Sequence, residues 1–237
     1  MHNRVFYELN IKITINQDLQ LDNSLNYIGN FIKFYKIFND KLKAEHITNN
    51  FKNYVFSNLY PIPKDKVYKK NKIYSLKIRS IDQELINYFF VQMNEKRNYK
   101  MIHINEITMS SVSLGKIIKI YSLNPAIILK NNGYITNQDD IEEVKKRITN
   151  NLLMKFRTYI DEDKIEDVNF IKSIKCNNRK PIGINYTDKN IKFLGNKYDI
   201  TIKEDRFSQE LALYAIALGI GEKNSIVGGG FCEYYSE

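Results

Sequence analysis

Residues 219–231 read Gly-Ile-Gly-Glu-Lys-Asn-Ser-Ile-Val-Gly-Gly-Gly-Phe and hold five of the ten glycines in a chain of 237 residues. Glycine tolerates positive φ and lets another molecule approach the backbone closely. Successive N–H groups in such a segment can turn toward an anion. Lys223, Asn224 and Ser225 add a positive charge, an amide and a hydroxyl. This composition predicts a phosphate-binding loop, and a flexible surface loop is the alternative.

The residues on either side of this glycine-rich loop predict its place in the fold. Apolar residues before it recur at helical spacing, namely Phe207, Leu211, Tyr214 and Leu218. A helix should therefore lead into the loop with Gly219 as its left-handed cap, and residues 231–235 alternate like a short strand. The order helix, loop, strand is not that of a Walker loop, where Gly-Lys-Ser/Thr opens a helix.

The bulk composition is that of a basic globular protein. Thirty-six Lys and Arg against 27 Asp and Glu give a net charge of +9, which fits an anionic partner such as nucleic acid, with a generic basic surface as an equal alternative. No apolar run approaches roughly 18 residues and no signal peptide is evident, so we expect a cytoplasmic protein without membrane association. Two isolated cysteines and three scattered histidines have no ligand spacing, so neither a metal nor another cofactor is expected.

Hydrophobic periodicity in the first half predicts the order β-α-β-β-α-β of a ferredoxin-like domain. The expected elements are a strand over 5–15, a helix capped by Asp22, a short helix over 39–46, strands over 51–59 and 73–78, a helix opened by a Ser80–Gln83 capping box, and alternating strand signals over 101–121 that break near Ser110 and Gly115. The sequence Ser-Leu-Asn-Pro at 122–125 is the expected boundary between two domains.

The second half repeats this order. Its expected elements are a strand over 126–130, a helix with Ile141, Val144, Ile148 and Leu152 as core positions, a strand over 168–176, a hairpin-like region over 183–203, the helix before the glycine-rich loop, and the final strand. We therefore predict an α+β fold of two tandem ferredoxin-like (RRM-like) domains, residues 1–122 and 125–237.

His46 is the one histidine with a basic residue placed near it at a predicted helix–strand junction. Lys52 follows six residues later, where a strand is expected to begin. Imidazole titrates near neutrality and can take or give a proton, and an ammonium group can stabilise charge on a phosphorane. A surface histidine near a helix C-terminus is the alternative.

Two segments resemble one known family, the CRISPR repeat-processing endoribonucleases of the RAMP superfamily. Residues 219–226, followed by glycines, resemble its C-terminal glycine-rich loop, with Val227 where the family normally has the first of two further glycines and Gly229 at the second. Residues 46–57, His-Ile-Thr-Asn-Asn-Phe-Lys-Asn-Tyr-Val-Phe-Ser, look like the family segment in which a general acid/base histidine precedes a lysine. His46 and Lys52 match those two positions.

The resemblance implies a metal-independent endoribonuclease that cuts CRISPR precursor RNA within each repeat. The 2′-OH would attack the neighbouring phosphorus, leaving a 2′,3′-cyclic phosphate and a 5′-OH, with His46 and Lys52 as catalysts. The implied partners are repeat RNA and other subunits of a CRISPR effector complex, for a monomer or homodimer. The expected RNA-binding residues form the loop, apart from the His46 chemistry: Gly219, Gly221, Lys223, Asn224, Ser225, Gly228, Gly229 and Gly230.

Some family members add a catalytic tyrosine from the first helix. Phe31 stands at the corresponding position here, and Tyr27 and Tyr35, one turn away on either side, are both candidates. The missing tyrosine keeps open a relative that binds repeat RNA without cutting it. A nucleotide-binding regulator that uses the glycine-rich loop is a third class of function.

Overall fold

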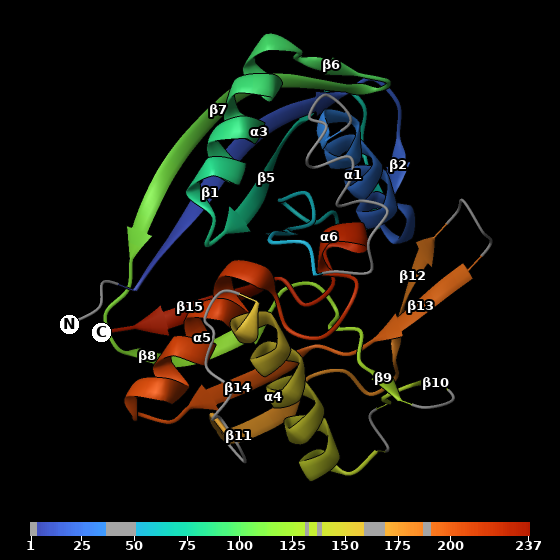
Figure 1. The fold of residues 1–237 in the computed structure, drawn as a ribbon. Coiled ribbons are helices and arrows are strands. Elements are labelled where there is room, and N and C mark those ends of the chain that lie inside the picture. The colour runs from blue at the N-terminus through green and yellow to red at the C-terminus, as the bar shows by residue number, and fades with distance from the viewer. Residues whose placement is uncertain (1–3, 37–50, 131–132, 137–138, 159–168, 187–190) are drawn as a thin grey trace.

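The computed structural model describes residues 4–36, 51–130, 133–136, 139–158, 169–186 and 191–237. The chain forms two halves, the N-terminal one above and the C-terminal one below in Figure 1. In each half, two helices lie against one face of an antiparallel sheet. The predicted α+β class with two ferredoxin-like units is confirmed.

The first half contains a five-stranded sheet in the order β3-β5-β1-β7-β6. Its elements are β1 (Val5–Ile15), β2 (Leu19–Gln20), α1 (Leu21–Lys36), β3 (Val55–Phe56), β4 (Val67–Tyr68), β5 (Ile73–Ser80), α3 (Gln83–Glu95), β6 (Asn98–Tyr99) and β7 (Ile102–Ser113). Alternation along β1 decides which face is covered, because Leu9, Ile11 and Ile13 are fully buried in the core with the apolar faces of α1 and α3.

The second half contains a four-stranded sheet in the order β11-β14-β8-β15. Its elements are β8 (Ile117–Ser122), β9 (Leu129–Lys130), β10 (Gly133–Tyr134), α4 (Ile141–Arg157), β11 (Ile171–Cys176), β12 (Ile182–Tyr186), β13 (Ile191–Gly195), β14 (Tyr198–Ile202), α5 (Arg206–Leu218), α6 (Asn224–Val227) and β15 (Cys232–Ser236). The hairpin of β12 and β13 projects from this half toward α1 (Figure 1).

The predicted domain boundary at 122 is wrong. β8 lies in the second sheet, where Ile120 pairs with Ile200 on one side and Tyr234 on the other. The boundary therefore falls between the end of β7 at Ser113 and the start of β8 at Ile117. Alternation continues on both sides of the break near Gly115, and a period of two cannot say which sheet a strand joins. Residues 126–130, expected to be the first strand of this half, form isolated bridges and β9 instead.

Three local expectations are also corrected. α3 is capped by Asp82, whose carboxylate accepts a hydrogen bond from the Leu85 N–H, so the Ser80–Gln83 capping box does not form. Ser80 instead hydrogen-bonds the Asn53 carbonyl and accepts from the Asp82 N–H. Asp22 lies inside the first turn of α1, which begins at Leu21. The strand expected over 51–59 is limited to β3, and the helix expected over 39–46 lies outside the described residues.

A buried arginine joins the two halves. Arg79 of β5 is 1% exposed; its Nε donates to Glu8 of β1 at 2.6 Å and its guanidinium pairs with Glu233 of β15 at 2.9 Å. It also donates to the Cys232 carbonyl at 2.5 Å and lies 4.5 Å from the centroid of the Phe231 ring. The end of the glycine-rich loop is thereby held against the first sheet.

We expect Arg79→Met to lower the free energy of unfolding by about 3–5 kcal/mol, because it leaves two carboxylates near a buried site without their cation. The melting temperature should fall by roughly 10 °C for a chain of this size, as measured by calorimetry. Arg97→Met removes an exposed arginine and is the matched control. Equal melting temperatures for the two variants would contradict this role for Arg79.

Candidate functional site

A pocket of about 390 Å³ opens where the two halves meet at the glycine-rich loop. Its lining comes from four places: Gly29, Asn30, Lys33 and Lys36 of α1; Phe51, Lys52 and Tyr54 before β3; Tyr186 of β12; and residues 222–226 of the loop. Among the described residues that line this space, four are lysines and one, Glu222, is acidic, so we name it the basic pocket. A concave site with this excess of positive charge favours an anion.

The basic pocket brings Lys52 together with Lys223. The loop was expected to lie apart from the catalytic segment, and the structure corrects this for Lys52, which shares the pocket with residues 222–226. The reason is long-range packing, because α6 within the loop contacts both α1 and β3. His46 lies outside the described residues, and its role stays a prediction.

The two candidate tyrosines are on the other side of α1. Tyr27 and Tyr35 share a helix face with Phe31 at spacings of four, whereas Gly29, Lys33 and Lys36 form the face that lines the basic pocket. The Tyr35 hydroxyl donates to the Lys96 carbonyl at 2.7 Å, and burial raises the pKa of Tyr35. The Tyr27 hydroxyl accepts from the Met101 N–H at 3.3 Å. Neither hydroxyl is brought to Lys52.

The glycine-rich loop is more ordered than its sequence indicates. Gly219 ends α5 with φ 77° and ψ 158°, so it has positive φ but is not a left-handed helical cap. The four-residue helix α6 follows, between Lys223 and Gly228, which are both left-handed with φ near 60°. Sequence periodicity could not find α6, since four residues are barely one helical turn.

The five glycines of the loop are all buried, and other parts of this chain fill the space beside them. At Gly221, with φ 69°, an added Cβ would fall against the Ile127 carbonyl oxygen, and at Gly230, with φ 64°, against that of Ile220. Gly219, Gly228 and Gly229 are similarly enclosed. We expected these glycines to admit RNA to the backbone, but the structure shows close packing within the chain at each of them.

A glycine that the sequence analysis missed fixes how α1 meets the loop. A Cβ at Gly29 would fall on the carbonyl oxygen of Ile226, so α1 and α6 approach each other at a position where only glycine fits. The signal in the sequence was an isolated glycine inside an amphipathic helix, which often has a packing reason.

We expect Gly29→Ala to lower the melting temperature and to weaken ligand binding in the basic pocket, because α6 must move away from α1. Alanine normally stabilises a helix interior by about 1 kcal/mol relative to glycine. A lower melting temperature in a thermal unfolding experiment therefore reports the contact and not helix propensity. A raised melting temperature would show that the contact does not constrain α1.

Lys155 of α4, in the core of the second half, holds the glycine-rich loop in place through hydrogen bonds. Its buried Nζ donates to the carbonyl oxygens of Gly219 at 2.6 Å and Gly221 at 3.0 Å, and to Asn224 Oδ1 at 2.9 Å. Three ammonium protons thus meet three acceptors. Burial lowers the pKa of Lys155 to about 7, although the nearby carboxylate of Glu222 acts in the opposite direction.

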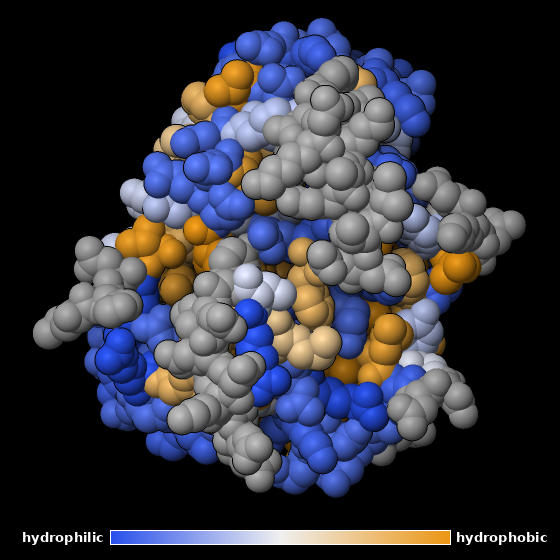
Figure 2. Space-filling view, viewed as in Figure 1, coloured by the Kyte–Doolittle hydropathy of each residue, from blue (hydrophilic) through white to orange (hydrophobic). Residues whose placement is uncertain are grey.

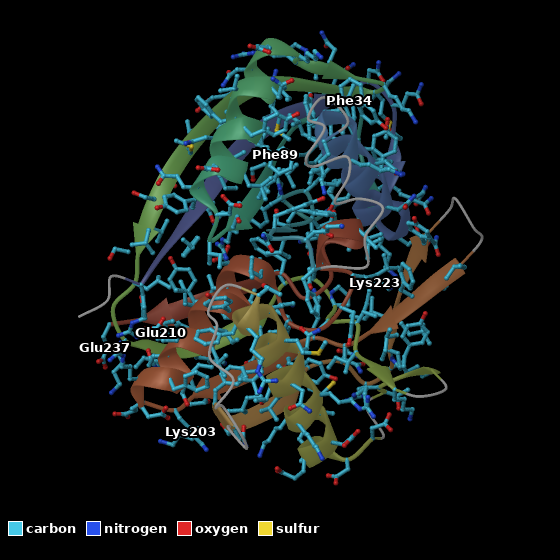
Figure 3. All side chains as sticks on the ribbon, in the orientation of Figure 1. Phe34, Phe89, Lys203, Glu210, Lys223 and Glu237 are labelled. Atoms are coloured by element: carbon cyan, nitrogen blue, oxygen red, sulfur yellow. The ribbon has the colours of Figure 1, made fainter. Side chains whose placement is uncertain are left out.

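The amide of Asn224 is also used within the loop. Its Nδ2 donates to the carbonyl oxygens of Ile220 at 3.1 Å and Gly229 at 2.6 Å. Of the residues predicted to bind RNA, Lys223 and Ser225 are the ones whose side chains are both partly exposed and at the basic pocket. Figure 3 shows Lys223 beside α6 at the junction of the two halves.

The surface around this junction differs from the rest of the viewed face. Most of the hydrophobic surface on that face lies in a band where the halves meet, and the surface above and below is largely hydrophilic (Figure 2). No three His, Cys, Asp or Glu side chains within the described residues gather in a way that could hold a metal ion. None of the helices in the described part of the chain combines the length and hydrophobicity that crossing a bilayer requires.

Solved structures of other proteins share this fold of two ferredoxin-like units. The chain is similar to "An RAMP protein binding different RNA substrates", with TM-score 0.73 and 17% identity over 97% of this chain and 100% of that one. It is also similar to the protein of "Characterization of a Cas6-related gene from Pyrococcus furiosus", with TM-score 0.68 and 15% identity over 98% and 99%. A "Cas6 product complex" matches with TM-score 0.64 and 12% identity over 98% and 100%.

Residues 116–234 match the family model described as CRISPR associated protein Cas6, C-terminal, and the chain belongs to this family. The family match begins one residue before β8, in agreement with the corrected boundary. No curated protein matches the chain by sequence.

Proposed function

We propose that this protein is an endoribonuclease that binds CRISPR precursor RNA and cuts it within the repeat without a metal ion. The observation that carries the proposal is the basic pocket, where Lys52 and Lys223 meet on a family member whose sequence places His46 six residues before Lys52. One similar structure is described as a RAMP protein binding different RNA substrates and another as a Cas6 product complex, and the first of these supports RNA as the ligand.

The proposed reaction is internal attack by the RNA itself. His46 accepts the proton of a 2′-OH, whose oxygen attacks the neighbouring phosphorus in line, and the P–O bond to the 5′-oxygen breaks. The leaving 5′-oxygen takes a proton from water, and His46 returns its proton to the solvent, so the products end in a 2′,3′-cyclic phosphate and a 5′-OH. Lys52 stabilises the negative charge that gathers on the phosphorane oxygens.

The remaining cations of the basic pocket would hold phosphates on either side of the scissile bond. Lys33 and Lys36 come from one face of α1, and Lys223 comes from the glycine-rich loop. Fixed cations at these places could neutralise developing charge in the way that a metal ion does elsewhere. We further propose a cytoplasmic protein that acts as a monomer or homodimer and that passes its product to other CRISPR subunits.

One observation favours a second candidate, a relative that binds repeat RNA without cutting it. The described part of α1 brings no tyrosine hydroxyl to the basic pocket, because Phe31 is fully buried and its neighbours Tyr27 and Tyr35 face the same way. A site that lacks one catalytic group would cleave RNA more slowly or not at all.

Incubation of the protein with repeat RNA in the presence of EDTA tests these candidates together. Specific cleavage supports the proposed enzyme, and a mobility shift without a cut supports the binding protein. A scrambled RNA of equal length and composition is the control for non-specific binding by a basic surface. If the repeat RNA is neither cut nor shifted, both candidates are overturned, and the third class, a regulator that binds a small nucleotide, is favoured.

A further inference from the structure

A second cavity lies beside the beginning of α1 and has a different chemistry. Its volume is about 460 Å³, within the range of roughly 300–1,000 Å³ that small-molecule sites occupy. The walls are mostly apolar and belong to both halves of the protein. The apolar side chains are Leu21, Leu25, Ile62, Leu123, Pro125, Ile182 and Ile184. We name this space the apolar cavity.

The apolar cavity and the basic pocket lie along one seam between α1 and β12. β12 contributes Ile182, Gly183 and Ile184 to the apolar cavity and Tyr186 to the basic pocket. On α1, Leu25 lines the first and Lys33 the second, on the same helix face. These two positions are eight residues apart, or about 12 Å along the helix axis. A short run of single-stranded RNA can reach from one to the other.

Hydrophobic side chains at the apolar cavity are exposed to solvent in the described part of the chain. Ile62 is 49% and Leu123 39% exposed, and both line the cavity. A planar base packed between such side chains removes apolar surface from water on both of its faces. The mainly apolar lining therefore fits the base of an unpaired nucleotide.

Two lysines supply the complementary charge for a phosphate. Lys197 is half-buried at the cavity, and within the described residues its Nζ makes no hydrogen bond or ion pair. Lys66 is exposed and also belongs to the lining. Asp22 also belongs to the lining, and its carboxylate accepts a hydrogen bond from Asn185 at 3.2 Å. Burial lowers the pKa of Lys197, as expected of an ammonium group without an anionic partner.

We propose that the apolar cavity holds one unpaired nucleotide of the RNA, a few nucleotides from the bond in the basic pocket. The base packs against the apolar walls and a phosphate pairs with Lys197 and Lys66. This contact contributes to specificity, because a base that is paired in an RNA duplex must leave the duplex before it can enter the cavity. This inference rests on the proposed function, since it places a second part of the same RNA strand.

The test combines cavity variants with RNA that lacks single bases. Leu123→Trp fills the mouth, and Val91→Trp changes an exposed apolar residue of α3 as its control. Lys197→Met removes the half-buried charge, and Lys203→Met removes an exposed lysine (Figure 3) as its control. We expect Leu123→Trp and Lys197→Met each to weaken repeat RNA binding about tenfold, in the range for loss of one base contact, and the controls to have little effect.

A series of repeat RNAs with one abasic nucleotide at each successive position identifies the base. For the wild-type protein, an abasic nucleotide at one position near the cut should weaken RNA binding about tenfold. For Leu123→Trp, the same abasic RNA should bind as well as the intact RNA does, because the contact is already lost. Additive losses at every position would overturn the inference while leaving cleavage, and so the proposed function, intact. Failure of the wild type to bind any repeat RNA would overturn the proposed function itself.

A final experiment distinguishes two ligands for the cavity, a nucleotide of the RNA strand and a free mononucleotide. AMP, GMP, CMP and UMP are titrated against wild type and Leu123→Trp, with circular dichroism to show that the variant is folded. We expect binding weaker than that of the repeat RNA by orders of magnitude, and competition by the RNA. A mononucleotide that binds tightly and stays bound when RNA is added would assign the cavity to a free nucleotide and contradict the proposal.

Discussion

We expect His46→Ala to slow cleavage of repeat RNA by about 10²–10⁴-fold, which is the usual contribution of general acid–base catalysis. RNA affinity should be nearly unchanged, because one imidazole is a small part of a basic interface that includes four lysines in its pocket. Single-turnover cleavage at saturating protein measures the first quantity, and a filter-binding titration measures the second.

His103→Ala is the matched control for this experiment. His103 is exposed on β7 and its Nδ1 lies 2.8 Å from Asn98 Oδ1, and it is not among the residues that line the basic pocket. The control should cut like the wild type. If His46→Ala cuts within about threefold of the wild type, a difference far below that range, His46 is not the catalyst.

We expect Lys155→Met to weaken repeat RNA binding and to lower stability, because it leaves three buried acceptors of the glycine-rich loop without their donor. An unsatisfied buried acceptor costs about 1–3 kcal/mol, and the loop can relax to recover part of this. Lys146→Met removes an exposed lysine from the same helix and gives the effect of charge alone. Equal RNA affinities for these two variants would contradict the role of Lys155.

A pH series separates positioning of the loop from general stability. The pKa of Lys155 is lowered to about 7, so raising the pH from about 6 to 9 removes a proton from Lys155 in the folded protein. A neutral amine offers two N–H donors to three acceptors, and it loses a positive charge near the RNA. Wild-type affinity should therefore fall over this range, and the part of that fall due to Lys155 should be missing from Lys155→Met. Glu222 and Cys232 are the titratable neighbours of this group, and both remain in the variant.

Much of the fold could be predicted from the sequence because its signals are local. Apolar spacing located α5 to within a residue at each end, the predicted α4 positions Val144, Ile148 and Leu152 lie in the core, and the alternation of β1 was correctly assigned to a strand. The order of helices and strands in each half followed from these patterns. The family resemblance rested on the glycine-rich loop and on residues 46–57, and the match over residues 116–234, which include the loop, confirms the family.

The features that were missed depend on contacts between distant segments. The sequence could not show that β8 pairs within the second sheet, or that the loop glycines are enclosed by Ile127 and Ile220. Helical geometry alone could have shown that Tyr27, Phe31 and Tyr35 share one face, yet not which face of α1 meets the loop.

The burial of Lys155 could have been predicted from its position in the sequence. Val144, Ile148 and Leu152 form the apolar stripe of α4, and Lys155 continues that stripe three residues later. A lysine at a core position must find acceptors within the protein, because an unpaired buried charge is costly. The sequence could indicate a buried cation there, but only the structure shows that the glycine-rich loop supplies its partners.

The most direct test of the central claim changes the RNA and leaves the protein intact. Wild-type protein is incubated in EDTA with repeat RNA that carries a single 2′-deoxynucleotide on the 5′ side of the scissile phosphate. Internal attack predicts that this RNA binds as well as the all-ribose strand and is not cut, while the all-ribose strand yields a 2′,3′-cyclic phosphate. Cleavage of the deoxy-substituted strand at the same position would contradict the account.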